Sequence, residues 1–317
     1  MKTLSLALLA LLGSSTAYCW DAQSHAAIGL VAEKRLTPET RRHIEHILGN
    51  FDLASIAGWM DELRSATKGF GPLAGNTEAR QFAQRYPHND QWHYVDLPLG
   101  ETKYTDDGPF SRPEDVVHEI NIAVRVLEDK SSAVPPRIAI YMIVHLVGEV
   151  HQPLHVANGF YDLSNPAHPV LITDPKAAAG KEDDKGANDL SFGSQRMDEL
   201  HAYWDGLLPA KVAGSKDPLA LAKKLSDAIQ SGAWASAGDH YSWAEGWATE
   251  SVAAARQAYA GISFGPAEME GGKLRRIHVT LPANYDVSAV PLARERLAKA
   301  AFHLAELLNA INWPARS

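Results

Sequence analysis

Four side chains of the types that bind metal ions occur in one apolar stretch, Ile138 to Val156. His145 and Glu149 are four residues apart, so on a helix they share one face, about one turn apart. His151 and His155 follow, with a proline between them. Because proline cannot continue a helix interior, we expect the helix to end or kink near His151 and the chain to bring His155 back toward the same site. Buried ionisable groups need partners, and a divalent cation is a strong one.

The alternative is that these side chains belong to an ordinary core, where a lone histidine is usually satisfied by local hydrogen bonds. A second pair, His201 and Asp205, is again four residues apart, with Trp204 beside the aspartate. Two such pairs on different helices are the usual way in which a helical bundle builds a site for several metal ions. The residues alone therefore indicate a helical metalloprotein with hydrolytic chemistry.

Two earlier segments carry further candidate residues. Asp61 precedes Arg64 by three positions, which on a helix gives either a pair of site residues or a local ion pair. His93 follows a tryptophan and is itself followed by Tyr94 and Asp96. The proline and glycine that come next favour extended chain here. The aromatic ring beside the histidine is then either a packing residue or a platform on which a base stacks.

The spacing of apolar residues predicts a mainly α-helical protein, with His25 in the first turn of the first helix. The polar insertion Asn158 to Asn188 is long enough to be either functional or mobile. Ile277 to Leu281 looks like a strand and is a candidate to pair with Val170 to Ile172 as a small β ribbon. The expected helices are Trp20–Leu36, one starting at Thr37–Pro38, Pro113–Leu127, Ile138–His151, Pro218–Ile229, Ser242–Tyr259 and Leu297–Ile311.

The first residues have the features of a secretory signal peptide. Lys2 is followed by the apolar run Leu4 to Leu12, and small residues before Trp20 suit cleavage after Cys19. The apolar run is too short to span a bilayer, so we expect a secreted or periplasmic protein without a membrane anchor. Cys19 is the only cysteine, so the mature chain has neither a disulfide nor a thiolate ligand. Any metal site must then use His, Asp, Glu and the backbone.

Length and charge limit the function classes. With 317 residues, we expect a signal peptide over residues 1–19 and one helical domain over residues 20–317. The formal net charge is -8, so the chain is not built to hold duplex DNA by counterion release alone. If the substrate carries phosphate, bound metal ions must supply the local positive charge.

The string HLVGEVHQPLH resembles the signature of the zinc-dependent single-strand nucleases secreted by fungi, plants and some bacteria. Four shorter pieces agree with that family in order: mature Trp20 with His25, WMD at Asp61, WHYVD at His93, and HAYWD at His201. Each piece is weak, but the five together span nearly the whole mature chain. The resemblance implies an all-α fold of the zinc phospholipase C and nuclease type, with three zinc ions in a cleft.

The resemblance also implies roles for individual residues. His151 would lie beside the ligands without being one, Arg64 would stabilise the transition state together with the ligand Asp61, and Tyr94 with Asp96 would form the base pocket. Glu149 stands where the family usually has Asp, which affects the third zinc first. The implied zinc ligands are Asp61, His93, His145 and Glu149 for the first ion, His155, His201 and Asp205 for the second, and the amino group and carbonyl of Trp20, with His25 and Glu149, for the third.

The function implied is endonucleolytic hydrolysis of single-stranded DNA and RNA to 5′-phosphate products, with a 3′-nucleotidase activity in many relatives. The expected partners are therefore single-stranded nucleic acid and nucleotides, with no membrane and no obligate protein partner. Two alternatives stay open. A zinc phospholipase C would need an exposed apolar rim for lipid, and a non-catalytic secreted zinc-binding protein would bind metal without hydrolysis.

Overall fold

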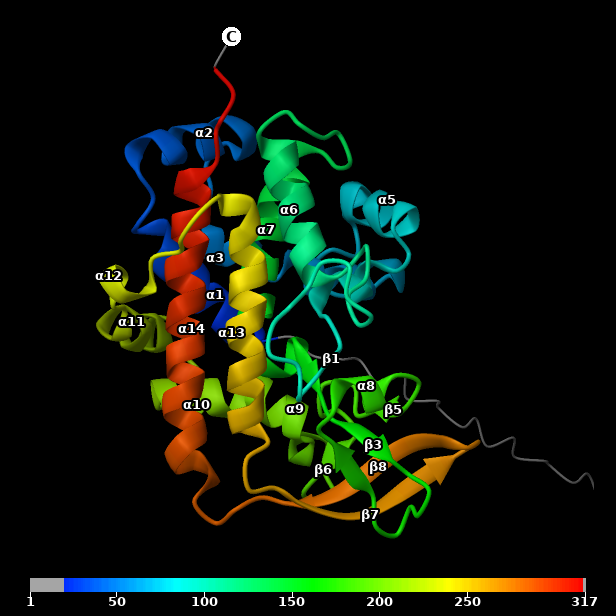
Figure 1. The fold of residues 1–317 in the computed structure, drawn as a ribbon. Helices are drawn as coiled ribbons and strands as arrows, with labels where there is room; N and C mark the ends of the chain where they lie inside the picture. Colours follow the sequence, from blue (N-terminus) through cyan, green and yellow to red (C-terminus); the bar gives the residue numbers. More distant parts are fainter. Residues whose placement is uncertain (1–19, 316–317) are drawn as a thin grey trace, which may run out of the picture.

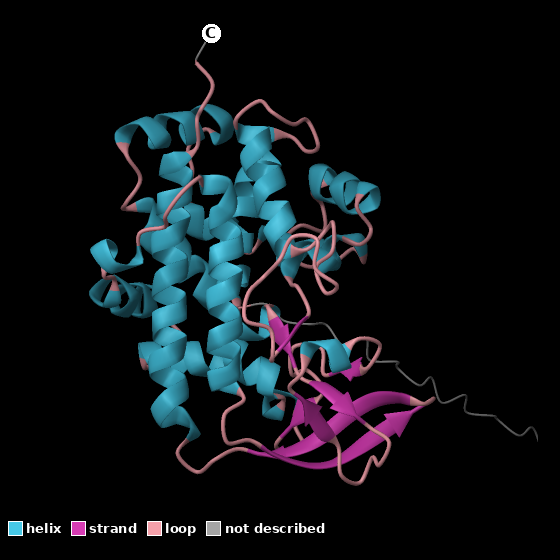
Figure 2. Ribbon diagram, in the orientation of Figure 1, coloured by secondary structure: helices cyan, strands magenta, loops and turns pink. Residues whose placement is uncertain are grey.

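The structure is a computed structural model that describes residues 20–315, so the expected signal peptide lies outside the described residues. Long helices pack side by side in one part of the molecule, and the short strands gather at one end of them (Figures 1 and 2). The mainly α-helical fold predicted from the sequence is confirmed. The helices are α1 (Ala22–Glu33), α2 (Pro38–Leu48), α3 (Leu53–Ile56), α4 (Trp59–Thr67), α5 (Thr77–Arg85), η1 (Asn89–His93), α6 (Val116–Leu127), α7 (Pro136–His151), η2 (Pro153–His155), α8 (Pro175–Ala178), η3 (Arg196–Asp198), α9 (Leu200–Ala202), η4 (Tyr203–Leu207), α10 (Leu208–Ala213), α11 (Pro218–Ala228), α12 (Ser231–Trp234), η5 (His240–Ser242), α13 (Trp243–Ala258) and α14 (Tyr285–Ala310).

Helix α7 is the centre of the core, and its ends are set by proline. Pro136 occupies the first turn, where the missing N–H costs nothing, and every residue from Met142 to His151 is buried. The helix ends at His151, as predicted, because the next residue is extended and is followed by Pro153. That short break starts η2, which carries His155.

The helices α1, α6, α13 and α14 pack around α7 and bring distant parts of the chain together. Two glycines allow close approach. A Cβ at Gly29 of α1 would lie 2.8 Å from the backbone of Ala54, and a Cβ at Gly148 of α7 would lie 3.1 Å from the His25 ring. The absence of side chains at these positions lets α1 place His25 directly against α7.

The strands form three small sheets. Strand β1 (Leu97–Pro98) pairs in parallel with β2 (Ala157–Asn158), which joins the segment after His93 to the segment after His155. The second sheet has the order β4-β3-β5 and the third has the order β6-β8-β7. The remaining bounds are β3 (Phe160–Asp162), β4 (Val170–Ile172), β5 (Glu182–Asp183), β6 (Leu190–Ser191), β7 (Ser263–Glu270) and β8 (Lys273–Thr280).

Two local expectations were wrong. The strand at residues 277–281 does not pair with Val170–Ile172. Instead, β8 forms a hairpin with β7, and β4 pairs with β3. Pairing with a strand that is near in sequence closes a shorter loop and therefore costs less conformational entropy. His93 lies at the end of a 3-10 helix, and the chain becomes extended only from Tyr94. The polar insertion 158–188 is folded into β2–β5 and α8.

The closing helix, predicted over Leu297–Ile311, begins much earlier than expected, because α14 starts at Tyr285. Capping residues mark the start of other helices. Thr37 caps α2, and the hydroxyl accepts the N–H of Thr40, as the Thr-Pro pair predicts. The helix expected from Pro113 starts three residues later, at Val116, because Asp115 takes the N-cap position. Within residues 20–315, none of the helices combines the length and the apolar character that a membrane span requires.

Candidate metal centre

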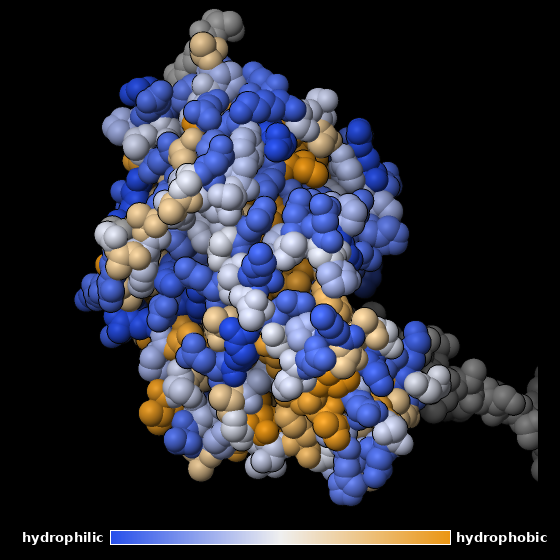
Figure 3. All heavy atoms as spheres, viewed as in Figure 1, coloured by the Kyte–Doolittle hydropathy of each residue, from blue (hydrophilic) through white to orange (hydrophobic). Residues whose placement is uncertain are grey.

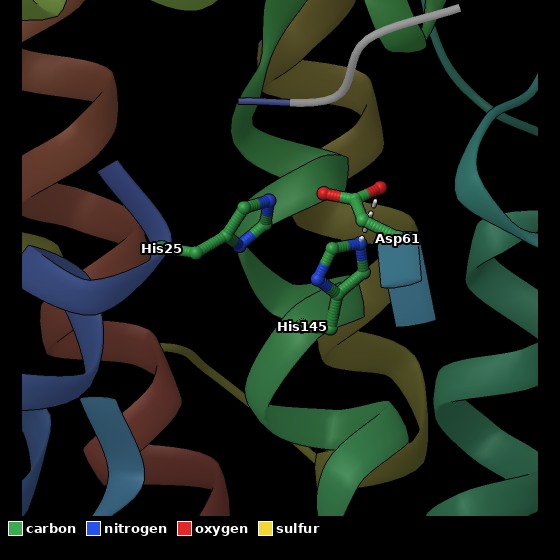
Figure 4. A group of neighbouring side chains, drawn as sticks. All are labelled: His25, Asp61 and His145. Carbon is green, nitrogen blue, oxygen red and sulfur yellow. Dashed lines mark ion pairs between the residues drawn. The ribbon is translucent and has the colours of Figure 1, made fainter. Parts of the chain in front are cut away.

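Donor atoms from helices far apart in sequence converge beside the end of α7. His25 on α1, Asp61 on α4 and His145 on α7 point toward one another (Figure 4). Three groups have one donor atom per residue within 4.8 Å of one another: His25, Asp61 and His145; His93, His145 and Glu149; and His155, His201 and Asp205. Eight of the nine predicted ligands therefore meet in one place. These groups differ in membership from the implied ligand sets, because His25 also groups with Asp61 and His145.

Glu149 lies at the middle of the convergence. One carboxylate oxygen, Oε1, is 2.9 Å from His25 Nε2, and the other, Oε2, is 3.0 Å from His155 Nδ1 and 3.5 Å from His93 Nδ1. The Glu149 side chain is fully buried. One carboxylate thus contacts histidines from three different elements, α1, η1 and η2.

His145 and His93 face each other near Asp61. The Nε2 of His145 is 3.2 Å from His93 Nδ1 and 3.7 Å from Asp61 Oδ1. The other His145 nitrogen, Nδ1, donates to the carbonyl oxygen of Ala57 at 2.7 Å. Such a bond fixes the tautomer and leaves the Nε2 lone pair directed into the site, as in histidines that bind metals.

The third group is built by a change of helix type. His201 lies on α9, and Asp205 lies on η4, a single turn of π-helix; such turns are frequent at functional sites. Their donor atoms, Nε2 and Oδ2, are 3.0 Å apart, and His155 Nε2 is 3.2 Å from His201 Nε2. His201 Nδ1 donates to Gly186 O at 2.6 Å, and the Gln152 amide donates to Asp205 Oδ1 at 2.8 Å. These bonds hold the other donor atom of each ligand toward the site.

The buried atoms of the site test whether metal ions fit it. Atoms fully removed from solvent and without a hydrogen-bond partner include both ring nitrogens of His25, both carboxylate oxygens of Glu149, Nδ1 of His155 and Oδ2 of Asp205. Leaving such groups unsatisfied costs several kcal/mol in total, at about 1–3 kcal/mol each. Because all are metal donors and face one another, cations fit the residues present. The donor set of histidine and carboxylate without thiolate suits zinc.

Electrostatics prepares these side chains for cations. Burial by itself raises the pKa of Glu149, but the surrounding histidines, His155 first, lower it well below its usual value. Burial lowers the pKa of His145 to about 3, so this imidazole is neutral at pH 7. Burial also lowers the pKa of His155, but the carboxylate of Glu149 outweighs it and raises the pKa to about 10. A divalent ion that binds an ionised carboxylate and its neighbouring histidines takes the place of the protons that these groups would otherwise share.

The remaining predicted ligand, Trp20, is fully buried at the start of α1. Its indole nitrogen donates to Gly148 O at 3.1 Å, and the backbone N–H of the next residue, Asp21, donates to Asp205 O at 3.1 Å. The start of the expected mature chain is thus fixed to Gly148, the residue before Glu149, and to the backbone of Asp205. Arg64 lies on α4 with Asp61, but its side chain lies outside the described residues.

The predicted base-binding residues have a partner that the sequence pattern did not indicate. The Arg112 guanidinium carbon lies 4.7 Å from the centre of the Tyr94 ring, and its Nη1 is 2.7 Å from Asp96 Oδ2. The other Asp96 oxygen accepts from the Asn158 amide at 2.8 Å, and the Asn158 Oδ1 is buried without a partner. Arg112 lies well after these residues in sequence, and the sequence analysis did not identify it; its charge alone could not have shown which residues it pairs with.

His151 does not lie beside the ligands, contrary to the expectation for its position. Its Nδ1 donates to Val147 O, and its Nε2 is 2.7 Å from His303 Nδ1 on α14. Two residues after Glu149, the side chain is on the opposite side of α7, because successive helical positions rotate by about 100°. His151 is therefore a packing residue between helices.

The fold and the site define a mainly α-helical protein with a buried centre for metal ions. The chain belongs to the S1/P1 nuclease family, whose model matches residues 20–312. It is 25% identical to nuclease P1 of Penicillium citrinum, over 92% of this chain and 98% of that protein. It is 23% identical to nuclease S1 of Aspergillus oryzae, over 97% and 96% of the two chains, and 23% identical to endonuclease 4 of Arabidopsis thaliana, over 93% and 90%.

Family membership gives the reaction class. The protein is a nuclease, a hydrolase of phosphodiester bonds, and nucleic acids are its substrate class. Three groups of histidine and carboxylate side chains could hold the metal ions that such chemistry commonly uses.

Proposed function

We propose that this chain is a secreted zinc-dependent endonuclease that cleaves single-stranded DNA and RNA to products with 5′-phosphates, with an accompanying 3′-nucleotidase activity. The observation that carries this proposal is the buried convergence of donor atoms around Glu149 in a member of a nuclease family. Signal-peptide cleavage before Trp20 is part of the proposal, and the family match, which begins at residue 20, supports it.

Three zinc ions are proposed, with Glu149 shared between two of them. When bound, they would supply positive charge to the phosphoryl oxygens and lower the pKa of water, so that hydroxide is available near neutral pH. The proposed holders are Asp61, His93, His145 and Glu149 for one ion, His155, His201 and Asp205 for another, and Trp20, His25 and Glu149 for the third.

The chain's own residues orient the substrate around that centre. We assign Arg64, one turn after the ligand Asp61 on α4, the donation of hydrogen bonds to the phosphoryl oxygens, which is worth a few kcal/mol as preorganised electrostatics. Tyr94 offers its ring to a base, and stacking there is worth ~1–3 kcal/mol. Asp96, held by Arg112 and Asn158, faces the edge of that base.

Preference for single strands follows from the base pocket. A base inside a duplex must first be unpaired and unstacked before it can lie on Tyr94, whereas a base in a single strand is already free.

The phospholipase alternative needs an exposed apolar rim. On the face in Figure 3 hydrophilic side chains predominate, and apolar side chains gather in its lower part. The large apolar side chains that are exposed among the described residues come from separate segments: Phe70, Val170, Met197, Leu219, Met269 and Val287.

The test combines metal analysis with substrate assays. The protein beginning at Trp20 is analysed for bound metals and assayed on single-stranded DNA, duplex DNA, RNA and phosphatidylcholine vesicles, each with and without chelator. We expect two to three equivalents of zinc, cleavage of the single strands to 5′-phosphate products, and loss of activity on chelation. Hydrolysis of phosphatidylcholine without DNA cleavage would replace the proposal by the phospholipase. Zinc binding with no hydrolysis of any substrate would leave a metal-binding protein.

A further inference from the structure

The loop between β5 and β6 holds an unusual backbone directly against His201, one of the proposed zinc ligands. Lys185, Gly186 and Ala187 have consecutive positive φ angles of 54°, 64° and 64°. Lysine and alanine rarely adopt this left-handed conformation, because the Cβ crowds the following carbonyl oxygen. Such a turn persists only where surrounding contacts fix it, and strained backbone of this kind clusters at functional sites.

The turn contacts His201 through backbone atoms. Gly186 O accepts the Nδ1–H of His201 at 2.6 Å, and Ala187 O accepts the backbone N–H of His201 at 3.3 Å. A Cβ on Gly186 would lie 2.3 Å from the carbonyl oxygen of Leu154, the residue before His155. The turn therefore fits between the segments that carry His155 and His201, and its carbonyl decides which His201 nitrogen keeps a proton.

A single buried carboxylate fixes this turn. Asp184 is fully buried, and its Oδ1 accepts the N–H of Ala187 at 2.9 Å and the N–H of Gly159 at 3.2 Å. Its Oδ2 accepts the Tyr161 hydroxyl at 2.8 Å and the Tyr259 hydroxyl at 2.9 Å. The carboxylate thus ties the turn to β3 and to the end of α13. No other described residue bonds both the turn and the end of that helix.

The backbone at Gly159 packs closely against the Asp184 side chain. A Cβ at Gly159 would lie 2.6 Å from Asp184 Oδ2 and 2.5 Å from the Tyr161 hydroxyl, so only glycine fits there. The backbone N–H of Asp184 also donates to Gly159 O at 3.0 Å. Displacement of the Asp184 side chain therefore moves the turn, since the same residue is bonded through its backbone and its carboxylate.

We propose that Asp184 is a positioning residue for the metal centre, which through the turn 185–187 fixes the tautomer and ring orientation of His201. The inference deepens the proposed function, because it concerns the site assigned to zinc. Asp184 touches neither the substrate nor a metal ligand side chain. Loss of a hydrogen-bond partner of a metal-bound histidine typically lowers the metal affinity by ~10–100-fold.

The test compares Asp184→Ala and Tyr259→Phe with the matched control Asp189→Asn. Asp189 lies in the same loop, but its carboxylate pairs with the exposed Lys185 ammonium at 2.8 Å and does not bond the turn's backbone. In metal-free protein, ¹⁵N–¹H NMR of the imidazole nitrogens reports the His201 tautomer. Zinc affinity is measured by competition with a chromophoric chelator, and circular dichroism checks the fold.

We expect wild type and Asp189→Asn to show His201 with the proton on Nδ1. In Asp184→Ala, the two tautomers mix and one zinc equivalent binds about 10–100-fold more weakly, with the other equivalents unchanged. Tyr259→Phe keeps the carboxylate and gives a smaller change in the tautomer populations and in zinc affinity. This variant tests the inference if Asp184→Ala fails to fold. An unchanged His201 tautomer and unchanged zinc affinity in the folded variants would overturn the inference.

The two proposals fail separately. If the wild type binds no zinc or leaves single-stranded DNA intact, the proposed function is wrong, while the tautomer measurement on metal-free protein still tests Asp184. If the wild type cleaves DNA and binds zinc but the variants retain the wild-type tautomer and affinity, only the positioning role is wrong.

Discussion

The Nε2 of His25 lies 2.9 Å from the Oε1 of Glu149, and both side chains are fully buried. The contact joins the first helix of the described chain to the end of the central one. It depends on Gly148, where a Cβ would press against the His25 ring at 3.1 Å. Neither atom of this pair has a hydrogen-bond partner, and a cation held between them, as proposed, would satisfy both.

The proposal assigns Glu149 to two of the three zinc ions, so a change at this residue tests the metal count. Glu149→Gln removes the negative charge between His25 and His155, so we expect loss of at least one zinc equivalent and at least a ~100-fold fall in kcat/KM. Glu149→Asp keeps the charge and should retain most activity, with weaker binding of one ion because the shorter arm reaches less far. Elemental analysis and single-strand cleavage measure both effects. A fully active Gln variant would refute the bridging assignment.

The donor group formed by His155, His201 and Asp205 should be essential for turnover. His155→Ala or Asp205→Ala removes one of three converging donors, and we expect cleavage of single-stranded DNA to fall below detection. His303→Gln is the control, because His303 is equally buried but bonds His151 and the Trp234 carbonyl instead of the site. If activity of the His155 or Asp205 variant stays near wild type while the control folds normally, those ligands are wrongly assigned.

Arg112 should affect substrate binding more than the chemical step. In Arg112→Ala, Tyr94 loses a cation over its ring and Asp96 loses its partner at 2.7 Å, so we expect KM for single-stranded DNA to rise about tenfold, or ~1.4 kcal/mol, with kcat nearly unchanged. Arg125→Ala is a matched control, since that guanidinium also covers a tyrosine, Tyr241, with 4.5 Å to the ring centre. Equal KM values for the two variants would remove Arg112 from the pocket.

The position of Trp20 predicts activation by signal cleavage. A free α-amino group has a pKa near ~8 and can bind zinc, whereas the amide of a longer chain cannot. We expect protein that retains residues 1–19, or one that carries a single extra glycine before Trp20, to bind one zinc fewer and to be at least ~100-fold less active. Mass spectrometry defines each amino terminus, and metal analysis accompanies the assay. Full activity with the extra glycine would contradict a ligand role for this amine.

The lowered pKa of Glu128, which lies away from the site, predicts how the free energy of unfolding depends on pH. Burial by itself raises the pKa of Glu128, but hydrogen bonds from Lys130, Tyr241 and the Asn312 backbone outweigh it and lower the pKa to about 2. Because the folded pKa is depressed, this stabilisation is present above the unfolded value of 4.5 and is lost as pH falls toward 2. Glu128→Gln should therefore cost about 2–3 kcal/mol of unfolding free energy at pH 7 and little near pH 2.

Urea unfolding at both pH values measures that difference. A constant gap between wild type and Glu128→Gln from pH 7 to pH 2 would show that the carboxylate charge contributes nothing there.

The sequence by itself determined the helical class, the end of the central helix and the side chains proposed as ligands. Helical spacing decides which residues share a face, so it pairs His145 with Glu149, and His201 with Asp205, whatever the rest of the chain does. Proline after His151 fixed the break that returns His155 to the site, because that residue type cannot continue a helix. These features are local, and a local pattern is sufficient for them.

Only the tertiary structure decided which distant elements meet. Contacts between segments apart in sequence decide the partners of Tyr94 and Asp96 and the packing of His151 against His303. They also decide the pairing of β4 with β3 and the Asp184 contacts with β3 and the end of α13. Side-chain type does not specify such contacts, because many arrangements of the same helices bury similar apolar area. The close packing permitted by Gly29, Gly148 and Gly186 selects one of them and so sets the distances on which the metal centre depends.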